Sequence, residues 1–364
     1  MNQKDLEECY RGKKVFITGH TGFKGSWLVQ WVKLLGAHIK GYALAPENDD
    51  DLYNLINGEK LCDSVIADLR DKVRLQEAIL SFEPDYIFHL AAQPLVRLSF
   101  EIPLETFDVN VIGTAHVLEA IRLLKKPCAV VLITTDKVYE NKEWVHPYRE
   151  TDALGGYDPY SASKACAELL INSYVQSFFN AERFNTHSKA IAVARAGNVI
   201  GGGDWAKDRI VPDIIRALSS NQPVIVRNPT SVRPWQHVLE PLGGYLLLGG
   251  RLFEDPESFS GAWNFGPFVE DNIAVETLVR NALQLWGNGT YKNESAPDQP
   301  HEAHFLRLDI SKALNYLQWK PKLNSSEAIE LTIAWYRQYK KDRRLVKEFT
   351  INQINSYMAD KPLK

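Results

Sequence analysis

Residues 13–25 read Lys-Lys-Val-Phe-Ile-Thr-Gly-His-Thr-Gly-Phe-Lys-Gly. The run from Lys13 to Thr18, with its β-branched and aromatic residues, predicts a strand, and the segment from Gly25 through Leu35 predicts a helix. Glycines at a spacing of three and three permit a tight turn, a close backbone approach to a pyrophosphate and close packing of helix on sheet. The helix N-terminus then offers free N–H groups to the phosphates, which favours a dinucleotide site over a purely structural turn. The residues expected to bind the dinucleotide here are Gly19, Thr21, Gly22, Phe23, Lys24 and Gly25.

The adenosine side of this site lacks an expected acidic residue. A second strand is predicted from His38 to Leu44, and an acid at its end usually binds the ribose hydroxyls. The chain instead has Ala43-Leu44-Ala45, with Glu47 as the first acid. Either Glu47 or a hydroxyl takes this role, or the cofactor is held less tightly; no arginine stands there to indicate a preference for a 2′-phosphate. After the third predicted strand, Asp68 and Leu69 are expected to flank the adenine, with a solvated loop aspartate as the alternative.

Strands and helices alternate through the first half of the chain. This pattern predicts an α/β fold with a Rossmann-type, doubly wound parallel sheet, because each right-handed crossover covers one face of the sheet. Further strands are predicted at Ser64–Ala67, Tyr86–Leu90, Ala129–Thr134 and Ile191–Ala196, and helices at Leu75–Phe82, Pro103–Lys125 and Ser161–Phe179.

The second half has a different texture. From Gly197 onward, Gly, Pro and Trp punctuate shorter elements, which indicates a smaller mixed α/β lobe that shapes a substrate pocket. We therefore expect a dinucleotide-binding domain over residues 1–196 and a substrate lobe over 197–364, with some later segments returning to the first domain. The tail after Pro321 is expected to form a surface-packed terminal helix.

The composition of the 364 residues excludes several functional classes. The chain has 42 basic and 45 acidic side chains, a net charge of −3 and no long block of like charge, so no nucleic-acid or membrane partner is indicated. The longest apolar stretches fall far below the roughly 20 residues of a membrane span, and the polar start lacks the apolar core of a signal peptide. Four scattered cysteines without a C-x-x-C pair predict reduced thiols rather than disulfides or a metal site, and hence a cytoplasmic protein.

Tyr160 and Lys164 are spaced i and i+4, which places a phenol and an ammonium on one face of a helix. A nearby ammonium favours the phenolate, so the lysine is expected to lower the pKa of the tyrosine from about 10 toward working pH. Such a tyrosine removes the proton of a substrate alcohol while hydride leaves the same carbon for a nicotinamide. Thr135, Asp136 and Lys137 follow a predicted strand, where open α/β sheets bind ligands. Together with the glycine turn, these residues indicate a hydride-transfer enzyme.

Several motifs resemble the extended short-chain dehydrogenase/reductase superfamily over nearly the whole chain. They are Gly19-x-x-Gly22-x-x-Gly25, His89-Leu90-Ala91-Ala92-Gln93, Asn110-Val111-Ile112-Gly113-Thr114, Tyr160-x-x-x-Lys164 and Arg195-Ala196-Gly197-Asn198-Val199. The superfamily contains nucleotide-sugar epimerases, decarboxylases and 4,6-dehydratases. The resemblance implies NAD as the cofactor, contacted beyond the glycine turn by Leu90, Ala91, Ala92, Asn110, Tyr160 and Lys164.

Asp136 and Lys137 distinguish between subgroups of this superfamily. An epimerase needs only the hydroxyl residue, the tyrosine and the lysine. A 4,6-dehydratase also needs an acid for the departing hydroxyl and a base for the C5 proton. The Thr-Asp-Lys sequence, with the opening from Gly19 to Leu28, is similar to the 4,6-dehydratases that act on CDP-glucose. This resemblance implies catalytic roles for Thr135, Asp136, Lys137, Tyr160 and Lys164.

In the implied reaction, Tyr160 takes the O4 proton as the C4 hydride passes to NAD. Asp136 protonates the departing O6, Lys137 removes or relays the C5 proton, and the hydride returns to C6. A lysine is a base only when neutral, which requires burial or a neighbouring cation such as Lys164. Otherwise Lys137 stays charged and stabilises the enolate, or merely pairs with Asp136. Two other functions stay open, a nucleotide-sugar 4-epimerase and a non-catalytic NAD(H)-binding regulator.

The second lobe carries most residues that the resemblance assigns to the nucleotide sugar, with CDP-glucose as the implied substrate. Asn198 and Arg233 match positions that touch the substrate diphosphate in relatives, and an arginine fork suits phosphate oxygens. The expected substrate residues are Gln93, Ser99, Asn198, Arg209, Val211, Arg227, Arg233 and His301, with His304 as a further candidate. Relatives dimerise, and sometimes form tetramers, through helices corresponding to 103–125 and 161–179, so a homodimer or homotetramer is expected.

Overall fold

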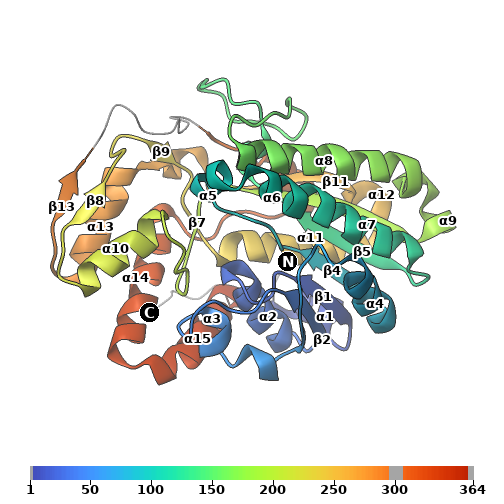
Figure 1. The fold of residues 1–364 in the computed structure, drawn as a ribbon, viewed down its shortest axis with the longest axis horizontal. Coiled ribbons are helices and arrows are strands. Elements are labelled where there is room, and N and C mark those ends of the chain that lie inside the picture. The colour runs from blue at the N-terminus through green and yellow to red at the C-terminus, as the bar shows by residue number, and fades with distance from the viewer. Residues whose placement is uncertain (1–2, 295–305, 360–364) are drawn as a thin grey trace.

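A seven-stranded parallel sheet forms the centre of the protein (Figure 1). The computed structural model describes residues 3–294 and 306–359. The strand order is β11-β6-β5-β4-β1-β2-β3, and each neighbouring pair is parallel. The order reverses at β1, which lies between β2 and β4, so the doubly wound, Rossmann-type sheet is confirmed. The sheet strands are β1 (Lys14–Thr18), β2 (His38–Ala43), β3 (Asp63–Ile66), β4 (Tyr86–His89), β5 (Cys128–Ile133), β6 (Lys189–Ala196) and β11 (Gly261–Phe265).

Helices cover both faces of the sheet because successive side chains of each strand point to opposite faces. In β1, Val15 and Ile17 belong to one buried cluster and Phe16 to the other. The helices on the first face include α2 (Phe23–Leu34) and α11 (Leu239–Glu254), and those on the second are α4 (Lys72–Phe82), α7 (Gly113–Leu123) and α8 (Pro159–Phe178). The other helices are α1 (Gln3–Tyr10), α3 (Leu52–Leu55), α5 (Val96–Glu101), α6 (Pro103–Phe107), α9 (Phe184–His187), α10 (Ile210–Ser219), α12 (Pro256–Phe259), α13 (Val275–Trp286), α14 (Ser325–Lys341) and α15 (Val346–Met358).

A smaller lobe lies beside the sheet and contains α10, α13 and α14 (left in Figure 1). Its short strand pairs are β7 (Val199–Ile200) with β10 (Gln236–His237), β8 (Val224–Val226) with β13 (Tyr291–Asn293), and β9 (Val232–Arg233) with β12 (Ile273–Ala274). β11 also comes from the later half of the chain, yet it pairs with β6 at the edge of the central sheet. The chain therefore crosses back to the sheet after building part of the second lobe.

The C-terminal segment forms two helices, so the expected single surface helix is wrong. α14 ends at Lys341, and Asp342 leaves helical geometry with φ −156° and ψ 102°. The side chain of Asp342 then accepts from the backbone N–H of Arg344 in the next turn. Trp335 and Tyr336 of α14 are fully buried. Neither glycine nor proline lies at the break, so the usual helix-breaking residues do not reveal it in the sequence.

The helix predicted over 103–125 is interrupted. α6 ends at Phe107, a π-helical turn spans Asp108–Ile112, and α7 ends at Leu123. The π turn contains the buried Asn110 and inserts an extra residue into the helical repeat. Across residues 3–294 and 306–359, no helix combines the length and the apolar character needed to cross a bilayer.

Candidate active site

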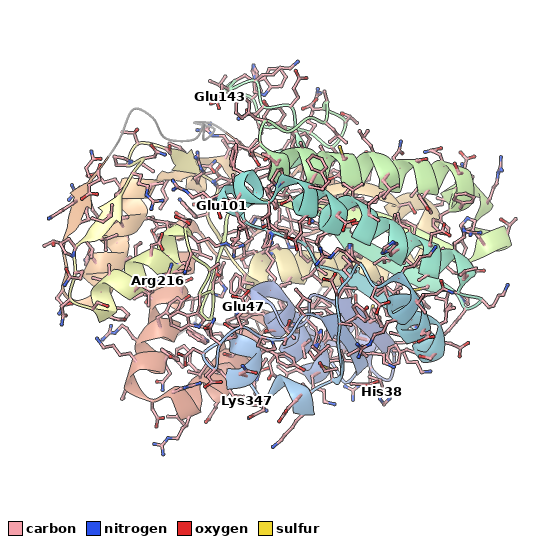
Figure 2. All side chains as sticks on the ribbon, viewed as in Figure 1. His38, Glu47, Glu101, Glu143, Arg216 and Lys347 are labelled. Carbon is pink, nitrogen blue, oxygen red and sulfur yellow. The ribbon has the colours of Figure 1, made fainter. Side chains whose placement is uncertain are left out.

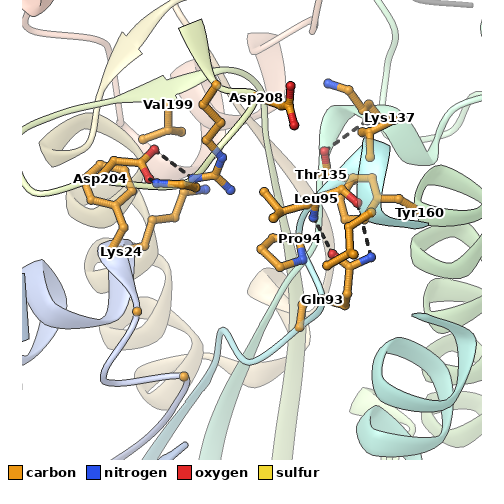
Figure 3. A pocket seen from close by; sticks show the side chains of 18 of the residues that line it. Lys24, Gln93, Pro94, Leu95, Thr135, Lys137, Tyr160, Val199, Asp204 and Asp208 are labelled. Carbon is orange, nitrogen blue, oxygen red and sulfur yellow. Dashed lines mark hydrogen bonds and ion pairs between the residues drawn. The ribbon is translucent and has the colours of Figure 1, made fainter. Parts of the chain in front are cut away.

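A cleft of about 1750 Å³ opens at the carboxyl ends of the central strands. The loops after β1, β4 and β5 line this cleft together with the segment 198–213. Figure 3 shows Lys24 and Asp204 on one side of this cleft and Thr135 and Tyr160 on the other. A pocket for one drug-sized ligand measures roughly 300–1,000 Å³. The cleft therefore has room for two ligands next to each other.

The glycine turn between β1 and α2 has the backbone geometry that its spacing predicts. Gly19 has φ 73°, and a Cβ there would lie 2.7 Å from the backbone nitrogen of Ala91. A Cβ on Gly25 would lie 2.0 Å from the carbonyl oxygen of Gly19. Among the described residues, no side chain caps α2 at its N-cap Gly22, and no acid lies in its first turn. The free N–H groups and close backbone approach fit the phosphates of a dinucleotide.

The adenosine side of the cleft is lined by residues 44–45 and by the exposed Glu47 (Figure 2). The carboxylate of Asp68 also lines the cleft, but it accepts from Nε and Nη2 of Arg70 at 3.0 and 2.6 Å. These hydrogen bonds lower the pKa of Asp68. The arginine thus engages the carboxylate that was expected to flank the adenine. Four other expected cofactor residues, Leu69, Leu90, Ala91 and Ala92, also line the cleft and form an apolar wall there.

Lys24 is a half-buried cation between the glycine turn and the second lobe. Burial lowers its pKa to about 7, the cations Arg209 and Lys164 add to this effect, and Asp136 and Asp204 oppose it. Asp204 is buried and pairs with Arg209 at 2.8 Å. Three cationic side chains and two carboxylates therefore surround the region where the two sides of the cleft meet.

Tyr160 and Lys164 lie in the cleft wall on α8. The helix begins after its N-cap Asp158, whose carboxylate accepts from the backbone N–H of Ser161 at 2.9 Å. The ammonium of Lys164 donates to the carbonyl oxygen of Ile133, at the end of β5, at 3.2 Å. Burial lowers the pKa of Lys164 to about 8. The cap thus fixes where α8 begins, and the lysine ties the helix to the strand that carries the other catalytic candidates.

The pKa of Tyr160 differs from the sequence-based expectation. Burial raises it to about 12, and the hydrogen bond with the Thr135 hydroxyl offsets only part of that rise. The prediction that Lys164 lowers the pKa of the phenol toward working pH is therefore wrong. The phenol is 8% exposed, so desolvation of its charged form dominates, while the ammonium is directed at a backbone carbonyl.

Asp136 and Lys137 follow Thr135 in a 3₁₀ turn, η3 (Asp136–Val138). The Thr135 hydroxyl donates to Asp136 Oδ1 at 2.9 Å, and the Lys137 ammonium lies 3.6 Å from the same oxygen. Asp136 is 1% exposed, and its Oδ2 has no hydrogen-bond partner in the described chain. Lys137 is a third exposed, so the strand end presents an ion pair with one buried and one accessible partner.

The family of the chain is shown by its similarity to known proteins. The family profile described as GDP-mannose 4,6 dehydratase matches residues 16–332. The chain belongs to this family. A CDP-glucose 4,6-dehydratase from Salmonella typhimurium (strain LT2) is 49% identical over 330 residues, which cover 91% of this chain and 92% of that protein.

Solved structures share the fold of this GDP-mannose 4,6 dehydratase family member at lower identity. A UDP-glucose 4-epimerase from Stenotrophomonas maltophila with bound NAD has a TM-score of 0.79 at 22% identity, covering 90% of this chain and 99% of its own. A dTDP-glucose 4,6-dehydratase from Streptomyces venezuelae, with NAD and TYD bound, has a TM-score of 0.76 at 19% identity, covering 92% and 99%. Epimerases and dehydratases thus share this fold, and the side chains of the cleft must distinguish their reactions.

The cleft of this family member brings together most residues expected to hold a nucleotide sugar. Arg227 pairs with Asp208 at 3.1 Å, and Arg209 is held by Asp204. Asn198 has a buried Oδ1 without a hydrogen-bond partner among the described residues. The expected substrate residues that line the cleft are Gln93, Asn198, Arg209, Val211, Arg227 and Arg233. His301 and His304 lie outside the described residues.

Two expected ligand-binding residues are placed behind the cleft wall. Ser99 is fully buried, and its hydroxyl accepts from the backbone N–H of Tyr160 at 3.1 Å. Asn110 accepts from the backbone N–H of Gln93 at 2.9 Å and donates to the Ser163 hydroxyl at 2.9 Å. Neither side chain is among those lining the cleft. Their polar groups instead brace the loop after β4 and the start of α8.

Other residues around the cleft carried no signal in the sequence motifs. Asp208 lies 3.8 Å from Arg97 of α5 and so links the two sides of the cleft. Glu168 accepts from the Thr134 hydroxyl at 2.6 Å, directly behind the catalytic candidates. The one sequence signal that points to Glu168 is its position four residues after Lys164, on the same helix face. Nothing in the sequence relates Asp208 to Arg97, because they meet only in the folded chain.

Proposed function

We propose that this protein dehydrates CDP-glucose to CDP-4-dehydro-6-deoxy-D-glucose with NAD as cofactor, in deoxysugar biosynthesis. The observation that carries the proposal is the buried Asp136 paired with Lys137 immediately after Thr135. Removal of water from C5 and C6 needs an acid and a base at one place, whereas 4-epimerisation needs neither. The 49% identity to a CDP-glucose 4,6-dehydratase supports the same reaction and the same nucleotide.

The glycine turn and the N-terminus of α2 would hold the pyrophosphate of NAD, with Leu90 to Ala92 and Leu69 as the apolar wall. When bound, this cofactor would accept hydride from C4 and return it to C6 of the same sugar, so these residues would need to hold one cofactor molecule through a whole turnover.

Tyr160 removes the O4 proton in the proposed oxidation at C4. Burial raises the pKa of this phenol to about 12, so release of its proton to solvent before the oxidation requires groups that stabilise the phenolate. The hydrogen bond with Thr135 and the cation of Arg209 already lower the pKa of the phenol. Lys164, four residues along the same helix face, would add further positive charge.

Asp136 and Lys137 carry out the elimination as a pair. Transfer of one proton from the Lys137 ammonium to Asp136, 3.6 Å away, creates a neutral amine and a carboxylic acid together. The amine takes the C5 proton while the acid protonates O6, the C6–O6 bond breaks and water leaves. Lys137 then returns its proton to C5, and the O4 proton held by Tyr160 passes to the Lys137 amine and restores the ion pair.

The second lobe would hold the nucleotide diphosphate. Arg233 and Asn198 lie in the cleft lining, and the unpartnered Oδ1 of Asn198 is buried there. Arg209 and Val211 are positioned at the start of α10 and would lie against the nucleobase. We propose that residues 197–364 act mainly as this substrate lobe, with β11 returned to the cofactor lobe.

Turnover of CDP-, dTDP-, GDP- and UDP-glucose in parallel tests the proposal. We expect CDP-glucose to give the alkali-induced absorbance of a 4-keto-6-deoxy sugar. A galactose-configured product without a ketone would establish the rival 4-epimerase instead. Full biological activity of a Tyr160→Phe variant would support the non-catalytic NAD(H)-binding regulator.

We further propose that the protein forms a homodimer or homotetramer and works in a reducing compartment, the cytoplasm. Leu104 of α6, Ile112 of the π turn, and Leu169 and Phe178 of α8 are exposed apolar side chains on neighbouring helices. Covering such a face against a second copy removes apolar surface from water. All four cysteines are free thiols, which supports the reducing compartment.

A further inference from the structure

Three residues of α8, spaced four apart, contact three successive residues at the end of β5, Ile133 to Thr135. Tyr160 is hydrogen-bonded with Thr135, Lys164 donates to the carbonyl oxygen of Ile133, and Glu168 accepts from the Thr134 hydroxyl at 2.6 Å. The i, i+4, i+8 spacing keeps all three side chains on one helix face. The proposed catalytic tyrosine is therefore in register with its threonine partner because two further contacts, one and two turns along, fix the helix to the strand.

Glu168 is the most firmly held of these three residues. It is 4% exposed, and Arg195 of β6 donates from Nε to both of its oxygens at 2.9 and 3.0 Å and from Nη2 to Oε2. Arg195 also donates to the Tyr139 hydroxyl at 2.7 Å. The carboxylate thus ties α8 to β5 through Thr134 and to β6 through Arg195, with charge-assisted bonds at both oxygens.

We propose that Glu168 is a positioning residue for the reaction, which holds α8 in register with β5 and keeps the Lys164 ammonium charged beside Tyr160. This inference rests on the proposed dehydration for its kinetic consequence. Its structural basis, the contacts of Glu168 with Thr134 and Arg195, does not depend on which nucleotide sugar is bound.

The charges around Lys164 give the inference a direction. Burial lowers the pKa of Lys164 to about 8, and the Glu168 carboxylate acts against this lowering. Lys24 on α2 also faces Lys164, as does His89 on β4, whose own pKa burial lowers to about 3. Lys24 and His89 are each neutral or positive, so Glu168 is the anion among these three neighbours of Lys164. Removing its charge lowers the pKa of Lys164 further, and the ammonium is then lost at a lower pH.

Glu168→Gln tests the inference with the shape of the side chain retained. We expect the alkaline limb of kcat/KM for CDP-glucose to move down by about one pH unit, with near wild-type rates at pH 6.5 and a roughly tenfold loss at pH 8.5. Thr134→Val is the matched variant, because it removes one hydrogen bond and leaves the carboxylate charged; we expect a lower rate at every pH and no shift of the limb.

A second variant covers the case in which the unpaired Arg195 prevents folding of Glu168→Gln. The double variant Glu168→Gln/Arg195→Met removes both buried charges and is expected to show the same shift of the alkaline limb. If kcat/KM of Glu168→Gln or of the double variant falls by the same factor at every pH, Glu168 has only a structural role and the inference is overturned.

Titration of Lys164 without substrate separates this inference from the proposed function. Carbon-13 NMR of the lysine ε carbons, assigned with Lys164→Met, is expected to report a lower pKa for Lys164 in Glu168→Gln than in the wild type. An unchanged titration would overturn the inference even if CDP-glucose is turned over. A lowered titration in a protein that turns over no nucleotide sugar would support it and reject the proposed function alone.

Discussion

Glu240 is a fully buried carboxylate that makes protein stability depend on pH. It lies at the start of α11, and its Oε1 accepts from the backbone N–H groups of Lys322 and Leu323 at 3.0 and 2.8 Å. Its Oε2 accepts from the Tyr357 hydroxyl of α15 at 2.9 Å. Burial raises the pKa of Glu240 from 4.5 to about 7. The same side chain thus ties α11 to the segment before α14 and to α15, and it resists ionisation.

The sign of the effect follows from that raised pKa. Between pH 4.5 and 7 the folded state binds the proton more tightly than the unfolded chain, so the free energy of unfolding falls as pH rises. With these two pKa values, the raised pKa of Glu240 costs about 1 kcal/mol of stability at pH 5 and about 3 kcal/mol at pH 8. The difference between the two conditions is about 2 kcal/mol.

Glu240→Gln is expected to remove this pH dependence while keeping the hydrogen bonds. The amide oxygen still accepts from both backbone N–H groups, and the amide nitrogen donates to the Tyr357 oxygen. The stability of the variant relative to wild type should therefore rise by about 2 kcal/mol between pH 5 and pH 8. Urea unfolding followed by tryptophan fluorescence measures this, with hydrogen exchange of the Leu323 amide as a local readout.

The matched control is Glu254→Gln on the same helix, where the carboxylate is half exposed and pairs with Arg251 at 3.1 Å. An exposed pair contributes at most about 1 kcal/mol, so its pH dependence should be small. If Glu240→Gln changes stability equally at pH 5 and pH 8, the raised pKa is refuted as the cause.

Three further perturbations test the site and the assembly. Asp136→Asn should slow water loss more than C4 oxidation, because the carboxyl acts as acid only in the elimination; equal loss of both steps in single-turnover NADH absorbance would contradict that role. Gly25→Ala places a Cβ 2.0 Å from the Gly19 carbonyl oxygen and should weaken NAD binding at least tenfold by calorimetry, whereas Gly266→Ala, with its nearest neighbour at 3.6 Å, should bind normally. Leu104→Glu, at a side chain 83% exposed, should shift sedimentation toward the monomer, and an unchanged oligomer would exclude this face.

The central strands were predictable because local chemistry determines them. β1 begins one residue later than predicted and β4 ends one residue earlier, since β-branched runs bounded by glycine and proline clusters mark buried parallel strands clearly. The break at Asp342 was not predictable in this way, because residues on both sides of it favour helix and the helix ends through a side-chain cap.

The site was predictable where a motif fixes the backbone, and less so where packing decides which side chains reach the cleft. The glycine turn and the residues after β5 line the cleft as expected. Ser99 and Asn110 matched the expected pattern, yet their polar groups are satisfied by backbone and neighbouring side chains behind the wall. The pKa of Tyr160 was predicted in the wrong direction, because spacing along a helix identifies a charged neighbour but not the desolvation that outweighs it.

The return of β11 to the central sheet sets an order in time for folding. β11 pairs with β6 from Gly261 opposite Ala192 to Phe265 opposite Ala196, and every residue of β6 is buried. A nascent chain that ends at residue 196 would leave β6 as an open, apolar edge, which readily pairs with other chains. Residues 1–196 expressed alone are therefore expected to aggregate, as light scattering would show. The cofactor lobe completes its sheet only after the ribosome has made part of the substrate lobe. The two lobes have separate binding roles, but they are expected to fold together.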